Sequence, residues 1–300
     1  MIAKIIVFLC FLLFYNEFRS FGNTTVLRGN KALIVVGDSS GYQKPLSKKR
    51  EPSKTPWSKK TPAEKKEILR EELKRVLPDN LQYIDSIFVD SRFKYDPSIV
   101  TIIKPKKKSC DYFSACFGLL THESISRGQL FYDRNRAWFD SAYARYGVDA
   151  SDILGIMRVE TNFGEWLGDK LVVNSLFTLY TTTRKKDFAF NELTAFISVC
   201  DLNKWNVFEM KGSYMSAWAL PQFLWTSYLR FAVDGDKNGI IDLRDESDAI
   251  LSIANYLKYH GYSKNLKSKQ RSILHYNHSS RYVQAVLAYA KAFKKSNKPH

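Results

Sequence analysis

One carboxylic acid lies on the apolar face of a short helical pattern, where an ionisable group is costly. Ile153, Ile156 and Met157 are spaced three and four residues apart and share one face of a helix. The next position on that face is Glu160, and Phe163 continues it. Burial disfavours the charged form of a carboxyl group and raises its pKa from about 4.3 towards 6 or above. Such a group suits general acid–base catalysis, while a structural glutamate neutralised by a buried Arg or Lys is the alternative.

A second cluster of oxygen-bearing side chains lies in one loop. Residues 234–242 read Asp-Gly-Asp-Lys-Asn-Gly-Ile-Ile-Asp, with side-chain oxygens at alternate positions and glycine at the sixth. Hard cations such as Ca²⁺ prefer this set of ligands, and the twelfth position is Asp245, which is shorter than the usual glutamate. A metal-free turn is the alternative. Extracellular sites of this kind bind Ca²⁺ weakly, at about 10⁻⁴ to 10⁻³ M, so we expect a structural role.

The net charge of +16 over 300 residues calls for an anionic partner or surface. Much of the basic excess lies in residues 44–66, among Pro and Ser, a composition that indicates a flexible linker. The chain has no zinc-finger spacing, RNA-binding aromatic motif or basic zipper, so we expect no nucleic-acid partner. A basic tether would adhere weakly to an anionic cell wall or membrane surface, and a solvated spacer is the alternative.

The first residues predict export. Ile5 to Tyr15 run apolar, which is too short for a spanning helix but typical of a signal peptide, and Ser20-Phe21-Gly22 resembles a cleavage site. We therefore expect a signal peptide at 1–22 and a periplasmic or secreted protein. An uncleaved N-terminal membrane anchor is the alternative.

Export changes how the cysteines are interpreted, because disulfides persist in oxidising compartments. Cys110 and Cys116 could pair across a short loop, and the sequence leaves the bridged and unpaired forms equally open. Cys200 follows apolar neighbours, which favours a buried free thiol.

The rest of the chain alternates helical patterns with polar breaks. Residues 63–76 form a charged amphipathic helix that Pro78 ends. From 124 to 146 the apolar residues keep one helical stripe, which Gly147 stops, and Asp149 is the N-cap acid of the next helix. Evenly spaced alternating runs are missing, so we expect a mainly α fold.

Composition divides the chain into three parts. Residues 1–22 are the predicted signal peptide, 23–79 a basic Pro/Ser/Lys-rich linker with a leading helix, and 80–295 the folded domain. Residues 23–62 have too few apolar side chains to bury, so we expect no regular structure there.

Several motifs together resemble a known family. Gly155–Gly164, which reads Gly-Ile-Met-Arg-Val-Glu-Thr-Asn-Phe-Gly with Gly168 after it, is similar to the catalytic helix of the lytic murein transglycosylase B family. Further segments match in family order: Tyr143–Val148, Lys211–Tyr214, Pro221–Phe223 with Ser227–Tyr228, Ala249–Gly261, and Tyr276–Ser279 with Tyr282. The ordered set spans roughly residues 81–290 and is far more specific than any single motif.

The resemblance implies a lysozyme-like helical fold and an enzyme of peptidoglycan glycan strands. Such an enzyme cleaves the β-1,4 bond between N-acetylmuramic acid and N-acetylglucosamine and leaves 1,6-anhydromuramyl ends, with no cofactor for catalysis. Glu160 takes the place of the single catalytic acid. The residues that match positions lining the sugar cleft or orienting the acid are Ser213, Gln222, Tyr256, Tyr276, Asn277 and Tyr282.

The resemblance also bears on the metal loop and on the size of the domain. The family closes its loop three residues beyond the twelfth position, which favours Asp248 over Asp245. The implied structural calcium ligands are then Asp234, Asp236, Asn238, the carbonyl of Ile240, and Asp248. Longer members insert a small β-domain between the segments that end at Gly261 and begin at Tyr276, and this chain has no room for one.

Two departures from the family pattern keep other functions open. The family's glycine-rich stretch is here the bulkier segment 216–221, and Trp225 stands where a proline is usual. Backbone that approaches a sugar through glycine cannot do so in the same way with larger residues. A lysozyme-like hydrolase that uses Glu160 with a positioned water is one alternative, and a catalytically weak wall-binding protein with a blocked cleft is the other.

Overall fold

A computed structural model of the chain describes residues 56–103, 110–182 and 185–297, together with the backbone of 15–21, 24–29 and 33–37. The described residues do not include the apolar run at 5–14 or most of the basic linker. The predicted adhesion of that linker to an anionic surface therefore concerns residues outside the described ones. The predicted mainly α fold is confirmed. The helices are α2 (Pro62–Val76), α3 (Leu81–Val89), α4 (Pro97–Ile103), α5 (His122–Arg134), α6 (Arg136–Tyr146), α7 (Ala150–Thr161), α8 (Val172–Thr182), α9 (Lys186–Asn203), α10 (Trp225–Phe231), α11 (Glu246–Tyr259), α12 (Leu266–Tyr276) and α13 (Ser280–Ser296).

Within the described residues, strands form two small antiparallel sheets. The first has the order β1 (Tyr15–Phe21), β2 (Thr24–Gly29) and β3 (Leu33–Gly37), and the second pairs β4 (Lys170–Leu171) with β5 (Lys211–Gly212). The expectation of no regular structure over 23–62 is therefore wrong for β2 and β3. The physical reason is that both strands are rich in β-branched residues, such as Thr24, Thr25 and Val26, which favour extended backbone.

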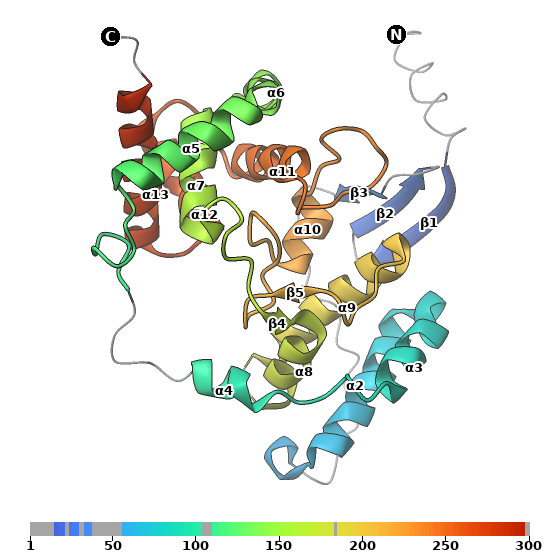
Figure 1. Ribbon diagram of the computed structural model, residues 1–300. Coiled ribbons are helices and arrows are strands. Elements are labelled where there is room, and N and C mark those ends of the chain that lie inside the picture. The colour runs from blue at the N-terminus through green and yellow to red at the C-terminus, as the bar shows by residue number, and fades with distance from the viewer. Residues whose placement is uncertain are drawn as a thin grey trace, which may run out of the picture.

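The leading helix α2 belongs to the folded core. It begins after Thr61, whose side chain accepts the Glu64 N–H while the Glu64 carboxylate accepts the Thr61 N–H, and it ends before Pro78 as predicted. Leu69 and Leu73 are fully buried. They lie in a first core cluster shared by α2, α3, α8, α9 and α10, and Figure 1 shows α2 beside α8 and α3 beside α2.

A second core cluster surrounds α7. Residues of α5, α6, α11, α12 and α13 pack against it, and Figure 1 shows α7 between α5, α12 and α13. Gly155 allows α7 to approach α13 closely, because a Cβ there would lie 2.6 Å from the carbonyl oxygen of Val286 in α13. Almost every residue of α7 is buried, so the helix has no solvent face and the predicted single apolar stripe is only part of its buried surface.

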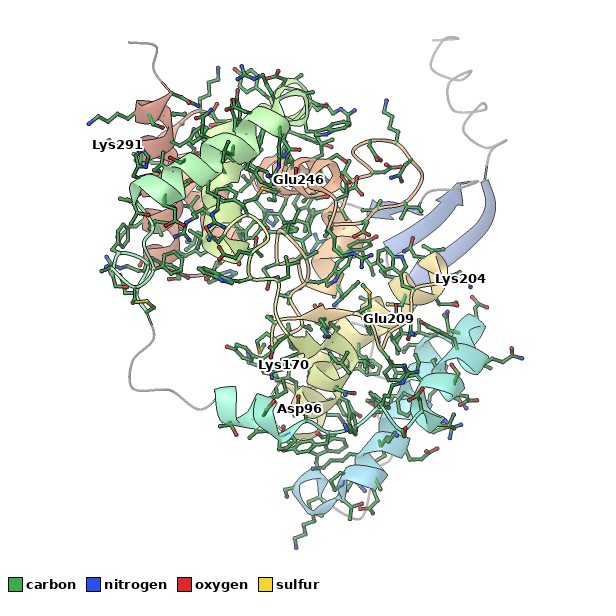
Figure 2. All side chains as sticks on the ribbon, viewed as in Figure 1. Asp96, Lys170, Lys204, Glu209, Glu246 and Lys291 are labelled. Atoms are coloured by element: carbon green, nitrogen blue, oxygen red, sulfur yellow. A yellow bond between two sulfur atoms is a disulfide. The ribbon has the colours of Figure 1, made fainter. Side chains whose placement is uncertain are left out.

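The helical stripe predicted over 124–146 is divided between two helices. The chain leaves helical geometry at Asn135, and Leu130, predicted on the stripe, is 68% exposed. Asn135 breaks the helix because its side-chain amide donates to the carbonyl of Phe131 and to Glu246 at the start of α11. Figure 2 labels Glu246 at this contact between α11 and the helices α5 and α6. Gly147 ends α6 in the left-handed conformation, as predicted.

The cysteines take the forms that export allows. Cys110 and Cys116 form a disulfide, and Cys200 is free and buried. The question that the sequence leaves open for the first pair is thus answered by the structure.

Candidate active site

Glu160 lies in the last turn of α7 and is only half-buried, unlike most residues of that helix. Burial raises the pKa of its carboxyl group from 4.5 to about 7, while the hydrogen bond from Tyr282 acts in the opposite direction. The Tyr282 hydroxyl donates to Glu160 Oε1 at 2.7 Å. In the part of the chain that the structure describes, no Arg or Lys neutralises this carboxylate. The paired structural glutamate is therefore not the arrangement found here.

Two of the predicted cleft tyrosines lie beside this acid, and the third packs against one of them. The rings of Tyr276 and Tyr282 are nearly parallel, with centroids 6.4 Å apart, and Tyr256 meets Tyr276 edge-on at 4.9 Å. The Tyr276 hydroxyl donates to the carbonyl of Pro221 at 2.6 Å, and the Tyr256 hydroxyl donates to the carbonyl of His275 at 2.8 Å. Burial raises the pKa of Tyr276, and the negative charge of Glu160 raises it further. These hydrogen bonds fix the rings as walls around the carboxyl group.

The end of α7 connects the acid to the segment that carries Gln222. Asn162 and Phe163 adopt left-handed φ values of 49° and 60° and turn the chain out of the helix. The Thr161 hydroxyl donates to the carbonyl of Leu220 at 3.0 Å. The side-chain amide of Gln222 donates to its own turn at Ala219 O, 2.9 Å away.

The other two predicted cleft residues make local contacts. The Ser213 hydroxyl accepts the N–H of Ala217 at 3.0 Å and that of Met215 at 3.3 Å, so it stabilises the turn after β5. Asn277 is exposed at the end of α12. The structure thus places Tyr276 and Tyr282 beside the acid and Tyr256 against Tyr276. It places Ser213 and Asn277 at the ends of neighbouring elements.

The bulky residues of segment 216–221 point into the core. Trp218 is 3% exposed and lies against Trp225, with ring centroids 5.0 Å apart. Ser216 and Ala219 nevertheless keep left-handed φ values of 69° and 60°, the conformation that glycine adopts most easily. The segment therefore makes glycine-like turns with non-glycine residues.

Sequence reasoning missed two residues near the acid. Tyr112 stands between the bridged cysteines and meets Tyr282 edge-on at 6.2 Å, and burial and then the charge of Glu160 raise its pKa. Arg158 is 3% exposed within α7 and donates to the carbonyls of Phe117 and Gly118, at 2.7 and 3.1 Å. The sequence did contain a signal for Tyr112, which is the pair of cysteines that flank it. The prediction relied on helical spacing and did not use that signal.

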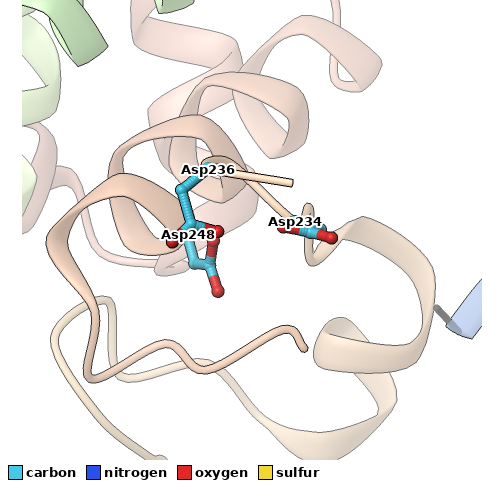
Figure 3. Close-up of side chains that lie close together, drawn as sticks. All are labelled: Asp234, Asp236 and Asp248. Carbon is cyan, nitrogen blue, oxygen red and sulfur yellow. The ribbon is translucent and has the colours of Figure 1, made fainter. Parts of the chain in front are cut away.

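The predicted metal loop folds into a compact acidic cluster. Ligand atoms of Asp234, Asp236 and Asp248 lie within 4.8 Å of one another. Figure 3 shows these three side chains. Burial raises the pKa of Asp248 to about 6 despite hydrogen bonds from the Gly235 and Asp242 N–H groups, each 2.7 Å long. A buried oxygen of Asp234, Oδ1, has no hydrogen-bond partner among the described residues.

These features fit a hard cation. An unpartnered buried carboxylate oxygen beside two further carboxylates is costly unless a positive charge joins them. Asp245, the twelfth residue, instead caps α11 by accepting the Ser247 N–H at 2.7 Å. The acid in the cluster is Asp248, as the resemblance implies.

A helical fold that encloses one desolvated glutamic acid among tyrosines is lysozyme-like. The profile of the transglycosylase SLT domain family matches residues 60–272, and the chain belongs to this family. Membrane-bound lytic murein transglycosylase B of Escherichia coli (strain K12) is 33% identical over 146 residues, which cover 48% of this chain and 40% of that protein. The chain thus spans less than half the length of this curated relative.

Solved structures share the fold. The E. coli lytic transglycosylase Slt35 in complex with bulgecin A has a TM-score of 0.71 and 21% identity, covering 77% of this chain and 93% of that one. SltB3 from Pseudomonas aeruginosa in complex with NAG-anhNAM-pentapeptide has a TM-score of 0.70 and 23% identity, covering 78% and 80%. Slt35 has also been solved in complex with calcium, with a TM-score of 0.69, 21% identity, and coverage of 77% and 93%.

Proposed function

We propose that this chain is a lytic transglycosylase that cleaves the β-1,4 bond between N-acetylmuramic acid and N-acetylglucosamine in peptidoglycan, with Glu160 as its single catalytic acid and base. The observation that carries the proposal is a carboxyl group with a pKa raised to about 7 and a hydrogen bond from Tyr282. A group that titrates near neutral pH can give a proton in one step and take one in the next. The membership of the family and the peptide-bearing sugar bound to SltB3 support the same substrate class.

The two proton transfers follow from this one residue. In its neutral form Glu160 protonates the bridging oxygen, so that the bond to C1 of the muramyl residue breaks and N-acetylglucosamine leaves as an alcohol. The substrate's own acetamido group supports the positive charge that develops. The carboxylate then takes the proton of the muramyl 6-hydroxyl, whose oxygen bonds to C1 and closes the 1,6-anhydro ring. Tyr282 stabilises the carboxylate between the two steps, because its hydroxyl donates to Oε1.

The cleft residues have supporting roles in this proposal. The residues that would bind sugars or orient the acid are Ser213, Gln222, Tyr256, Tyr276, Asn277 and Tyr282. Aromatic faces and amide or hydroxyl groups recognise sugars through apolar contact and hydrogen bonds. Because Trp218 and Ala219 are buried in the core, the bulky segment does not fill the cleft, which favours catalysis over a binding-only protein.

A product assay tests the proposal against its alternatives. Purified glycan strands incubated with the full chain should yield 1,6-anhydromuramyl ends. New reducing ends would indicate the hydrolase, and intact strands that bind the protein would indicate the wall-binding protein. Glu160→Gln should lose activity by a factor of about 10² to 10⁴ or more, as expected for general acid–base catalysis, and still bind glycan. Glu123→Gln, at an exposed position of α5, is the matched control and should cleave at the wild-type rate.

The acidic cluster supports a structural calcium site. The ion would be held by Asp234, Asp236, Asn238, the carbonyl of Ile240 and Asp248, and it would neutralise the cluster and hold the loop before α11. The unpartnered oxygen of Asp234 and the calcium in the solved Slt35 complex support this assignment.

The location of the enzyme follows from its substrate and its first residues. Peptidoglycan lies outside the cytoplasmic membrane, so the signal-peptide pattern at 1–22 and the disulfide both agree with an exported protein. Among the described residues, no helix is long and apolar enough to cross a membrane. The relative in E. coli is membrane-bound, so an anchored form is the other outcome of a fractionation experiment.

A further inference from the structure

The disulfide closes a loop that is held mainly by a few specific contacts. Between Cys110 and Cys116, Asp111 and Phe113 are exposed and Tyr112 is half-buried. A segment with so little buried apolar surface has low local stability by itself. We refer to residues 110–118 as the bridged loop.

The first anchor of the bridged loop is an ion pair with α13. Arg281 donates to both oxygens of Asp111, at 2.8 Å from Nη2 and 3.0 Å from Nε. The guanidinium group also lies 4.4 Å from the ring centroid of Phe113. Such a two-point pair fixes orientation as well as distance. Arg281 directly precedes Tyr282, the residue that donates to the acid.

The second anchor comes from the catalytic helix itself. Arg158, two residues before Glu160, donates to the carbonyls of Phe117 and Gly118 and to the Ser124 hydroxyl. It is nearly fully buried, so its charge depends on these hydrogen bonds. The bridged loop is therefore fastened at both ends to the two helices that supply the acid and its hydrogen-bond donor.

Between these anchors Tyr112 fills the space beside the acid. Its ring meets Phe117 edge-on at 5.3 Å and Tyr282 edge-on at 6.2 Å. These contacts extend the wall that Tyr276 and Tyr282 form around Glu160.

We propose that the bridged loop is a positioning element for the acid: the disulfide and the two arginine anchors hold Tyr112 against Tyr282, and this contact keeps water away from Glu160. The inference rests on the proposed function for its effect on catalysis. Its effect on the carboxyl group itself is a separate property of the protein and is measured separately.

Loosening the bridged loop should lower the pKa of Glu160. Water that reaches the carboxyl group favours its charged form, so the pKa of Glu160 falls from about 7 towards 4.5. A fall of one pKa unit cuts the protonated fraction at pH 7 from about one half to about one tenth, which is a loss of about fivefold. Because the first step needs the protonated acid, the alkaline limb of the pH–activity profile moves to lower pH.

Other titratable groups around the acid do not obscure this change. The tyrosines that face Glu160 are Tyr112 from the loop, Tyr276 from α12 and Tyr282 from α13. Burial and then the charge of Glu160 raise the pKa of each of them, so all three stay neutral where the acid titrates. The Asp111–Arg281 pair stays ionised, because each partner favours the charged form of the other.

Two variants loosen the loop in different ways. The double variant Cys110→Ser/Cys116→Ser removes the bridge, and Arg281→Gln removes the ion pair but leaves the bridge intact. The pKa of Glu160 is measured in the full chain by ¹³C NMR of glutamate carboxyl groups, with the resonance assigned by its loss in Glu160→Gln. The pH–activity profile is measured on the same samples. We expect both variants to lower the pKa by about one unit and to move the alkaline limb by the same amount.

Matched controls separate positioning from general destabilisation. Arg136→Gln breaks a comparable exposed ion pair, with Asp133 at 3.0 Å, and should leave the pKa of Glu160 unchanged. Arg281→Lys keeps a cation beside Asp111, so the pKa of Glu160 should fall less in this variant than in Arg281→Gln.

Each outcome decides the inference. If the pKa of Glu160 is the same in the wild type and in Arg281→Gln, and in the double variant where that folds, the bridged loop has no positioning role. A wild-type carboxyl group that titrates near 4.5 overturns it as well. If the wild type cleaves no glycan but the variants lower the pKa, the proposed function fails and the positioning role stands.

Discussion

Replacing the acid by its amide should stabilise this protein at neutral and alkaline pH. Glu160 has a pKa raised from 4.5 to about 7, because its charged form loses hydration in the site. The folded state therefore binds the proton more tightly than the unfolded chain. The stability that this proton contributes is complete below pH 4.5 and is lost as the pH rises through about 7. Glutamine keeps the shape and can accept the hydrogen bond from Tyr282, but it never ionises.

The expected difference between Glu160→Gln and the wild type follows from that rise in pKa. At about 1.36 kcal/mol for each pKa unit, the rise from 4.5 to about 7 means that the free energy of unfolding of the variant should exceed that of the wild type by about 3 kcal/mol at pH 8.5 and by about zero at pH 4. Urea unfolding at a series of pH values measures it. Asp248, with its pKa raised to about 6, titrates in both proteins and cancels in the difference. A difference that stays constant between pH 4 and 8.5 would refute the desolvation of Glu160.

Three further outcomes follow from the described contacts. Tyr282→Phe removes the hydrogen bond that lowers the pKa of Glu160, so the alkaline limb of the pH–activity profile should move to higher pH by about one unit. We also expect kcat to fall. Ala219→Gly relieves a left-handed φ of 60° and should raise the free energy of unfolding in urea by about 0.5 to 1 kcal/mol; a loss of stability would show that this backbone is unstrained. Chelator should lower the melting temperature of the wild type, and Asp236→Ala should melt at the same temperature with and without chelator, because an ion that binds only the folded state stabilises it. Equal melting curves of the wild type in calcium and in chelator would exclude the metal site.

The acid could be found from the sequence because the clue was local. A glutamate in register with Ile153, Ile156 and Met157 is visible within eight residues, and those neighbours are indeed fully buried. The alternating oxygens of the acidic loop were visible for the same reason. Both patterns depend on the spacing of residues along one element, which a sequence prints directly.

The burial of α7 on every face was not visible, because it depends on contacts with residues far apart in the chain. The buried Arg158 donates hydrogen bonds to carbonyls about 40 residues away in the sequence. The buried Asp152 accepts one from Lys269, which is 117 residues away. No spacing rule encodes such contacts, so α7 was predicted with one buried face and is buried on all of them. The break at Asn135 was missed for the same reason, since it depends on Glu246.

The two departures from the family pattern form one coupled change in the core. Where the family usually has proline, Trp225 has a backbone N–H, which donates to the buried carboxylate of Glu192 at 2.7 Å. The same carboxylate accepts from Thr226, so it caps α10 while burial raises its pKa. The ring of Trp225 lies stacked on Trp218 from the bulky segment, at 5.0 Å. Both tryptophans are buried, and the carbonyl of Pro221 still accepts the hydrogen bond from Tyr276. The changes therefore alter the packing behind the cleft and leave the tyrosine wall around the acid in place.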